Sequence, residues 1–338
     1  MNRTELKDLI IRLADSIGVS GDEFSAADAA LSELRRFIPD AEISGGNVLG
    51  TAAKDCGGTV VLDAHIDQIG LIVTDIDDSG FIKVGNVGGV DLRLMAAQEV
   101  IIHGSSAVHG VVCSTPPHLS DGDDKVVKIS EISIDCGMTK EAVSGLISAG
   151  DRITFADGAK SMLGSRISGH ALDNRCGVAA VLYALSLTDM SKLKRRLCVC
   201  FTSSEEVGER GAKTAAFISE ADTAIVVDVS FAYSDGEKRE KCGELGKGCM
   251  IGISPTLDRA LSNEMISISK EAEIPYQLEV MSGETGTNAD QYSVIGCGAK
   301  AVTLSVPLRY MHTPVEVIDV SDVEATGRII AEYIRRCC

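Results

Sequence analysis

The sequence predicts an α/β fold in which helices cover both faces of a mostly parallel sheet, with a small β-rich domain inserted into it. Two patterns predict this fold. Strand-like apolar runs alternate with helical patterns near the N-terminus and after residue 165, whereas short strand-like runs separated by turn residues dominate in between. With 338 residues, the chain is longer than most chains that fold around a single hydrophobic core. We therefore expect an α/β domain from residues 1–69 and 166–338, and an inserted β-barrel-like domain from residues 70–165.

The N-terminal part predicts two helices followed by a buried strand. Residues 4–17 and 24–37 repeat apolar side chains at helical spacing, and the loop at 18–22 between them ends in a helix-capping aspartate. Residues 59–65 form a largely apolar run, which is typical of a strand buried on both faces.

The middle of the chain has a different character. Glycine, aspartate and serine turns divide it, and only residues 140–149 have a helical pattern. Its strand-like runs lie at residues 70–74, 81–84, 99–103, 107–113 and 151–155. These short strands predict the small β-rich insertion.

After residue 170 strands and helices alternate again, which predicts crossover connections and parallel strands. The expected strands are residues 197–202, 223–229, 277–281 and 301–306. The expected helices are residues 174–187, 211–219, 259–273 and 322–336, the last being amphipathic.

The acidic composition limits the classes of partner. With 32 Lys and Arg residues against 49 Asp and Glu residues, the net charge is −17. Nucleic acids and anionic membranes are also negatively charged, so neither is expected as a partner. A secretory leader pattern and an apolar membrane-spanning run are both missing, and the 11 scattered cysteines favour reduced thiols. We therefore expect a cytoplasmic protein.

Potential metal ligands follow several of the predicted strands. Ligands bind beyond the carboxyl ends of the strands in an open parallel sheet, so side chains at those ends are expected to converge on one crevice. The residues at such positions are His65, Asp67, Asp173, Glu205, Glu206, Asp228 and His312. Histidine nitrogens combined with carboxylate oxygens suit Zn²⁺, Co²⁺ or Mn²⁺.

Each of these residues alone has a simpler explanation. Asp173 is placed as a helix N-cap, the Glu205–Glu206 pair resembles solvated surface, and Asp228 is typical of a turn. Their joint placement at one sheet edge favours a metal site. The histidines of the insertion, His103, His109 and His118, are expected to be structural.

Five segments in a fixed order resemble the motifs of the M42 metallo-aminopeptidases, also called tetrahedral aminopeptidases. The resemblance extends from the first helix to the last. The segments are His-Ile-Asp-Gln-Ile-Gly at 65–70, Ala-Leu-Asp-Asn-Arg-Cys-Gly at 171–177, Thr-Ser-Ser-Glu-Glu-Val-Gly at 202–208, Gly-Thr-Asn-Ala-Asp at 286–290 and Val-Pro-Leu-Arg-Tyr-Met-His-Thr-Pro at 306–314.

This resemblance implies two divalent metal ions, Zn²⁺ or Co²⁺. One ion would be held by His65 and Asp228 and the other by Glu206 and His312, with Asp173 bridging both. It implies that Glu205 is the general base for a hydroxide shared by the ions and that Asp67 orients the His65 side. It also implies a cis peptide bond after Asp173, dimerisation through the insertion, and dimers that assemble into a tetrahedral dodecamer acting on short peptides with a free N-terminus.

Three alternatives remain at this point. A carboxypeptidase or deacylase of the M20 type has similar ligands, but such enzymes insert their extra domain between the residues equivalent to Asp228 and His312. A glucanase would use two carboxylates and leave the histidines without a purpose. A non-catalytic metal-binding scaffold would not need Glu205. The departures Gln68, Ser204 and Asn288 from the family motifs bear on substrate preference and rate.

Overall fold

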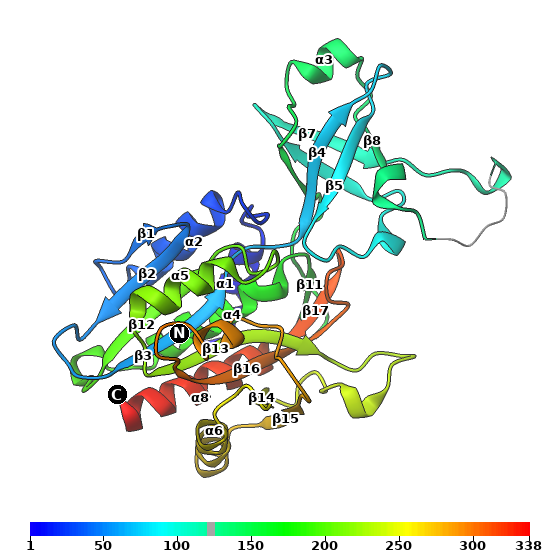
Figure 1. The fold of residues 1–338 in the computed structure, drawn as a ribbon. Helices are drawn as coiled ribbons and strands as arrows, with labels where there is room; N and C mark the ends of the chain where they lie inside the picture. Colours follow the sequence, from blue (N-terminus) through cyan, green and yellow to red (C-terminus); the bar gives the residue numbers. More distant parts are fainter. Residues whose placement is uncertain (120–125) are drawn as a thin grey trace.

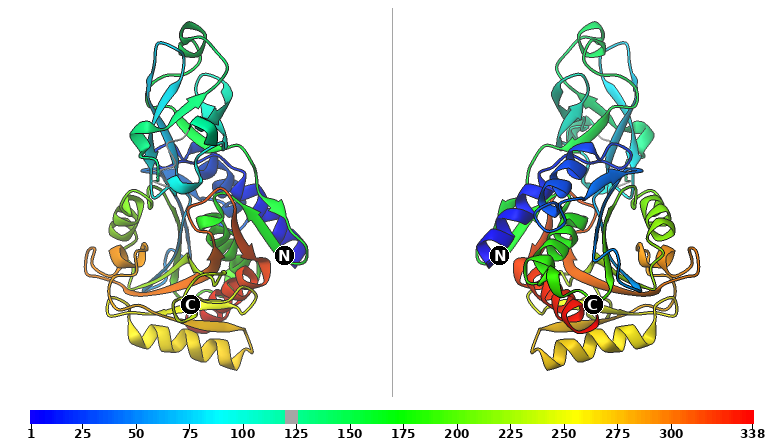
Figure 2. Two further views of the ribbon diagram at one scale, coloured as in Figure 1. Left: turned by 90° about the vertical axis from the view of Figure 1, so that its right-hand side faces the viewer. Right: turned by 90° about the vertical axis from the view of Figure 1, so that its left-hand side faces the viewer.

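The computed structural model describes residues 1–119 and 126–338. They form a large mixed sheet covered by helices and a separate closed barrel (Figure 1). The barrel stands at one end of the molecule, and helix α6 (Arg259–Glu271) lies at the opposite end (Figure 2). None of the helices in this part of the chain has both the length and the apolar character that crossing a bilayer requires.

Four parallel strands form the centre of the large sheet. In spatial order they are β12 (Arg196–Thr202), β3 (Thr59–His65), β13 (Thr223–Phe231) and β16 (Lys300–Arg309). They are buried almost throughout, as strands covered on both faces must be. Because they are parallel, their carboxyl ends lie at one edge of the sheet.

The strand pairs on both flanks of the sheet are antiparallel, except that β14 (Cys249–Ile253) and β15 (Tyr276–Val280) are parallel. The expected mostly parallel arrangement therefore holds at the centre and in this one further pair. For β1 and β2 the short connection explains the direction: the Gly45–Gly46 turn joins two antiparallel neighbours directly, whereas parallel neighbours need a crossover. The remaining strands are β1 (Glu42–Ser44), β2 (Asn47–Ala52), β10 (Lys160–Ser161), β11 (Arg166–Gly169), β14 (Cys249–Ile253), β15 (Tyr276–Val280) and β17 (Glu316–Asp319).

The barrel is built from the middle of the chain. Its strands close in the order β4 (Gly70–Ile76), β5 (Ile82–Val87), β8 (Ser133–Asp135), β7 (Ala107–Val112), β6 (Glu99–His103) and β9 (Arg152–Phe155). Alternate residues such as Leu71 and Val73 point inward and form a core of their own. Helix α3 (Lys140–Ser144) packs on it through Val143. The domain boundaries at 69/70 and 165/166 stay a prediction, although β10 already pairs within the large sheet.

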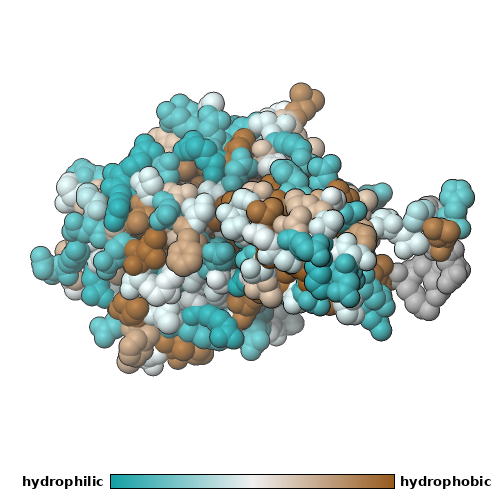
Figure 3. Space-filling view, turned by 90° about the horizontal axis from the view of Figure 1, so that it is seen from above, coloured by the Kyte–Doolittle hydropathy of each residue, from teal (hydrophilic) through white to brown (hydrophobic). Residues whose placement is uncertain are grey.

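Apolar residues are also exposed on the barrel and its loops. Seen from above, this face of the molecule mixes hydrophilic and hydrophobic residues (Figure 3). Exposed apolar side chains of the barrel region include Leu94, Val111, Leu119, Val126 and Val127.

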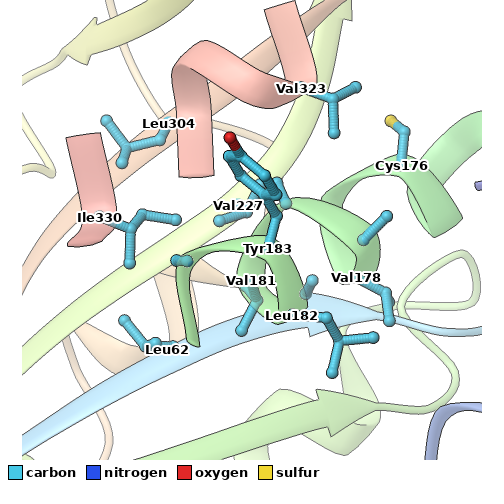
Figure 4. Packing of buried hydrophobic residues seen from close by; sticks show 14 of the residues in the cluster. Leu62, Cys176, Val178, Val181, Leu182, Tyr183, Val227, Leu304, Val323 and Ile330 are labelled. Carbon is cyan, nitrogen blue, oxygen red and sulfur yellow. The ribbon is translucent and has the colours of Figure 1, made fainter. Parts of the chain in front are cut away.

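Helices cover both faces of the large sheet, and strand β3 illustrates how. Val60 and Leu62 face the core that contains α4, whereas Val61 points to the other face and packs with Ala212 and Ala215 of α5. Figure 4 shows the α4 side chains between the strands and α8. These helices are α1 (Arg3–Ala14), α2 (Phe24–Leu34), α4 (Leu172–Ser186), α5 (Arg210–Ser219), α7 (Ala289–Tyr292) and α8 (Val320–Cys337).

Candidate active site

A cleft of about 430 Å³ opens beyond the carboxyl ends of the central strands. His65 ends β3, Asp228 lies on β13, and Asp173 lies at the start of α4. The cleft brings together six of the seven predicted site residues: His65, Asp173, Glu205, Glu206, Asp228 and His312. The convergence expected from the parallel strands is therefore present.

The six side chains form two groups that share Asp173. In the first, Nε2 of His65 lies 3.2 Å from Oδ1 of Asp173 and 3.6 Å from Oδ1 of Asp228. In the second, Nε2 of His312 lies 3.4 Å from Oδ2 of Asp173 and 3.4 Å from Oε2 of Glu206. Each oxygen of the Asp173 carboxylate thus faces a different histidine.

Both histidines are held from behind by a backbone carbonyl. Nδ1 of His65 lies 3.1 Å from the carbonyl oxygen of Asp67, and Nδ1 of His312 lies 3.1 Å from that of Gly89. In the tautomers that donate these hydrogen bonds, each Nε2 lone pair points into the cleft. Such a carbonyl contact is typical of histidines that bind metals.

Asp67, the seventh predicted residue, lies behind the cleft and is fully buried. Its carboxylate accepts hydrogen bonds from the Ser20 hydroxyl at 2.6 Å and from the backbone N–H groups of Glu205 and Glu206 at 2.9 and 3.1 Å. Oδ1 of Asp67 also lies 3.4 Å from Nδ1 of His65. Asp67 therefore fixes the position of the loop that carries both glutamates.

Glu205 and Glu206 point to different parts of the cleft. The Glu206 carboxylate faces His312, whereas Glu205 forms no side-chain hydrogen bond among the described residues and stays near His65. Burial raises the pKa of Glu205 to about 9; His65 opposes this rise, and the charge of Asp228 adds to it. No neighbouring donor in the described part of the chain therefore holds the Glu205 carboxyl group in place.

The electrostatics of the cleft fit divalent cations. Burial and the neighbouring carboxylates raise the pKa values of Glu206 and Asp228. Against the effect of burial, contacts with Asp173 and Glu206 raise the pKa of His312 to about 11. Acidic groups outnumber cations in this cleft, and the donors of each group lie within 4.8 Å of one another. Nitrogen and oxygen donors so spaced match the ligand preferences of Zn²⁺, Co²⁺ and Mn²⁺.

Glu316, which was not predicted from the sequence, links two predicted ligands. This buried carboxyl on β17 accepts hydrogen bonds from the backbone N–H of Asp173 and from that of His312, both at 3.1 Å. The only signal in the sequence is a glutamate that opens a short apolar run, which is common on strand surfaces.

The loop after barrel strand β5 was also not predicted to reach the cleft. A side chain added at Gly88 would meet Cβ of Glu206 at 3.2 Å, and one at Gly89 would meet Nδ1 of His312 at 2.8 Å. The barrel therefore contributes backbone to one wall of the candidate site.

The backbone is unusual where several candidate ligands lie. Ala171, Ser204 and His312 have φ angles between 56° and 62°, a region that residues other than glycine rarely adopt. The Asp173–Asn174 peptide bond is cis, as the resemblance implied. These two residues also depart from helical dihedrals, so the regular part of α4 follows them.

Comparison with known proteins adds independent findings. The family model described as M42 glutamyl aminopeptidase matches residues 46–329. The chain belongs to the M42 family of aminopeptidases. It is therefore a hydrolase that acts on peptides, which disfavours the glucanase and scaffold alternatives.

Individual members of the M42 family match over nearly the whole chain. The lysyl aminopeptidase of Pyrococcus furiosus is 31% identical, covering 95% of this chain and 94% of its own. The solved aminopeptidase from the archaeon Desulfurococcus kamchatkensis has a TM-score of 0.93 and 31% identity, covering 99% of this chain and 96% of its own. The TET1 peptidase of Pyrococcus horikoshii has a TM-score of 0.84 and 28% identity, covering 98% of this chain and 99% of its own. It is described as assembling into a tetrahedron or a large octahedral shell.

Proposed function

We propose that this chain is a two-metal aminopeptidase that removes N-terminal residues from short peptides. The observation that supports it most directly is the position of Asp173, whose two carboxylate oxygens face two separate histidine–carboxylate groups. A carboxylate in that position is suited to bridging two ions.

The donor sets divide the ligands between two sites. His65 and Asp228 with one oxygen of Asp173 would hold one ion, and Glu206 and His312 with the other oxygen would hold the second. We propose Zn²⁺ or Co²⁺ at both. Bound there, the ions would lower the pKa of water and polarise the scissile carbonyl.

Glu205 acts in this proposal as the general base. Bound divalent ions would oppose the effect of burial and lower the pKa of Glu205, so that it is ionised. Its carboxylate would then take a proton from the attacking water and pass it to the leaving amine, which keeps the proton balance of hydrolysis. Asp67 is a positioning residue, because it holds the backbone of Glu205 and Glu206. The acidic cleft attracts the positively charged amino terminus of a peptide.

We also propose that the chain forms dimers through the barrel and that six dimers build a tetrahedral dodecamer. The assembly described for the TET1 peptidase supports this proposal. Active sites enclosed in such a shell would accept only short, unfolded peptides.

The decisive experiment measures hydrolysis of aminoacyl-p-nitroanilides by chelator-stripped protein, before and after addition of Co²⁺ or Zn²⁺. Metal-dependent release from free substrates but not from N-blocked ones is expected, with two ions bound per chain by elemental analysis. The Glu205→Gln variant should keep its metal and lose about 10²- to 10⁴-fold in kcat. Release from N-blocked substrates, or full activity of the variant, would contradict the proposal.

A further inference from the structure

The cleft contains an acidic residue that the proposed chemistry does not use. Glu279 on β15 lines the cleft together with the proposed metal ligands. Its carboxylate accepts hydrogen bonds from the hydroxyl of Ser230 on β13 and, at 2.9 Å, from that of Ser305 on β16. Both serines are buried, so the carboxylate is held against the strands.

The charge of Glu279 has no partner in the cleft wall. Burial raises the pKa of Glu279, and the two serine hydroxyls only partly oppose this rise. Among the described residues that line the cleft there is no lysine or arginine. A carboxylate withdrawn from water is costly unless a cation or enough donors compensate it, so a positively charged ligand would be favoured here.

A second polar group in the same wall is without a partner. Thr303 lines the cleft, but its hydroxyl is fully buried and has no hydrogen-bond partner among the described residues. Thr303 and Ser305 are two residues apart on β16, so their side chains lie on the same face of the strand. This hydroxyl lies against Gly252 of β14 and is closed off from the cleft, so the polar groups that a ligand meets here are Glu279 and the serines that hold it.

The cleft also has apolar side chains in its wall. Phe231, Met281 and Met311 also line the cleft. Such side chains suit the methylene chain of lysine or arginine, whose charged end then reaches a polar partner. An acidic substrate side chain would instead meet Glu279 with the same charge.

We infer that this region receives the side chain of the N-terminal substrate residue and that Glu279 selects peptides that begin with lysine or arginine. The inference rests on the proposed function, because it assigns the substrate class of the same cleft. Glu279 is then a specificity-determining residue that contacts the substrate away from the scissile bond.

The test compares matched substrates on the metal-loaded wild-type enzyme. The p-nitroanilides of lysine, arginine, norleucine, leucine and glutamate are used, because norleucine has nearly the shape of lysine without its ammonium group. We expect kcat/KM for lysine to exceed that for norleucine by about 10- to 100-fold, the size of a hydrogen bond to a charged group. The glutamate substrate should be the slowest. The lysine-to-norleucine ratio is measured on the wild-type enzyme, so it does not depend on the folding of any variant.

The Glu279→Gln variant keeps the shape and removes the charge. It should bring the lysine-to-norleucine ratio close to one and leave the norleucine rate within a few-fold of wild type. Glu284→Gln is the matched control, because Glu284 lines the same cleft but is exposed, where a charge is screened. It should change the ratio less than about threefold.

The outcomes separate this inference from the function on which it rests. Wild-type preference for norleucine, leucine or glutamate would overturn the inference and leave aminopeptidase activity intact. An equal loss for lysine and norleucine in Glu279→Gln would also overturn it, since Glu279 would then act on the amino terminus that all substrates share. Hydrolysis of none of the substrates would contradict both.

Discussion

At the scale of single residues, the candidate site depends on Asp67, which does not line the cleft. Its carboxylate accepts hydrogen bonds from Ser20, Glu205 and Glu206. Although burial opposes it, contacts with His65 and these donors lower the pKa of Asp67 below its usual value. A carboxylate with this many donors is ionised and rigid, so it can orient His65 and the loop of the two glutamates together.

Asp67→Asn should weaken metal binding by about 10- to 100-fold, because the amide cannot accept all three hydrogen bonds and leaves a buried donor unpaired. The measurement is a competition titration with a fluorescent metal chelator, accompanied by kcat. The matched control is Asp77→Asn, since Asp77 also accepts hydrogen bonds from two backbone N–H groups but lies in the barrel. Unchanged metal affinity in Asp67→Asn would refute the positioning role.

At the scale of elements, the barrel and the α/β part meet at the candidate site. The loop that follows β5 brings Gly89 against His312, and the backbone N–H of Asp91 donates to the carbonyl oxygen of His312 at 3.3 Å. The loop packs so closely because residues 88 and 89 lack side chains. The orientation of one candidate ligand therefore depends on an element of the other structural unit.

We expect Gly89→Ala to displace the imidazole of His312, since the added Cβ would lie 2.8 Å from Nδ1. The ion proposed at Glu206 and His312 should then bind more weakly than the other, and titration calorimetry should resolve one weakened site. Gly85→Ala is the control: it lies on β5, where the nearest atom to an added Cβ is 3.4 Å away. If both sites of Gly89→Ala bind metal with wild-type affinity, close packing of the loop is not needed to orient His312.

The packing of α8 against α4 gives a prediction on stability. A Cβ at Gly327 of α8 would lie 2.7 Å from the carbonyl oxygen of Ala180 and from Cδ1 of Tyr183. Gly327→Ala should lower the free energy of unfolding by about 1–3 kcal/mol, despite the higher helix propensity of alanine. Urea titration measures this. Gly145→Ala, at a helix end with ordinary contacts from 3.4 Å, should be neutral or slightly stabilising, and equal behaviour of the two variants would contradict the packing argument.

At the scale of the whole molecule, net charge opposes the association of chains, whereas exposed apolar surface favours it. The net charge of −17 favours solubility and separation of chains. Exposed valines and leucines on the barrel, among them Val111 and Leu119, favour association where they can be buried together. Association through the barrel would leave the opposite end of the molecule, with α6, free for other contacts (Figure 2).

The proposed dodecamer has a mass that can be measured. Twelve chains of 35.6 kDa give about 430 kDa, and light scattering coupled to size exclusion should find this mass or that of a dimer intermediate. Added salt screens the repulsion between acidic chains, so it should shift the equilibrium toward the larger species. A single-chain mass at every concentration and salt level would contradict the assembly.

Much of the architecture could be predicted because its signals are local. The alternation of apolar strands and amphipathic helices is encoded within windows of about 10 residues, so α8 and the central strands were expected close to their observed bounds. His65 and Asp228 could be recognised as candidates because a strand end is visible in the sequence. The antiparallel flanks were not predicted, because short strands such as β1 and β17 have too few residues to show a period.

Sequence patterns alone were enough to predict the α/β class, the separate β-rich segment and the residues able to bind metal. Which of these residues face one another depends on how the chain folds. Asp173 and Glu316 are 143 positions apart, and His312 and Gly89 are 223 apart. No local pattern reports such pairs, because they are brought together by strand order and loop packing. The same holds for Glu279, whose place in the cleft depends on the pairing of β15, β14 and β16.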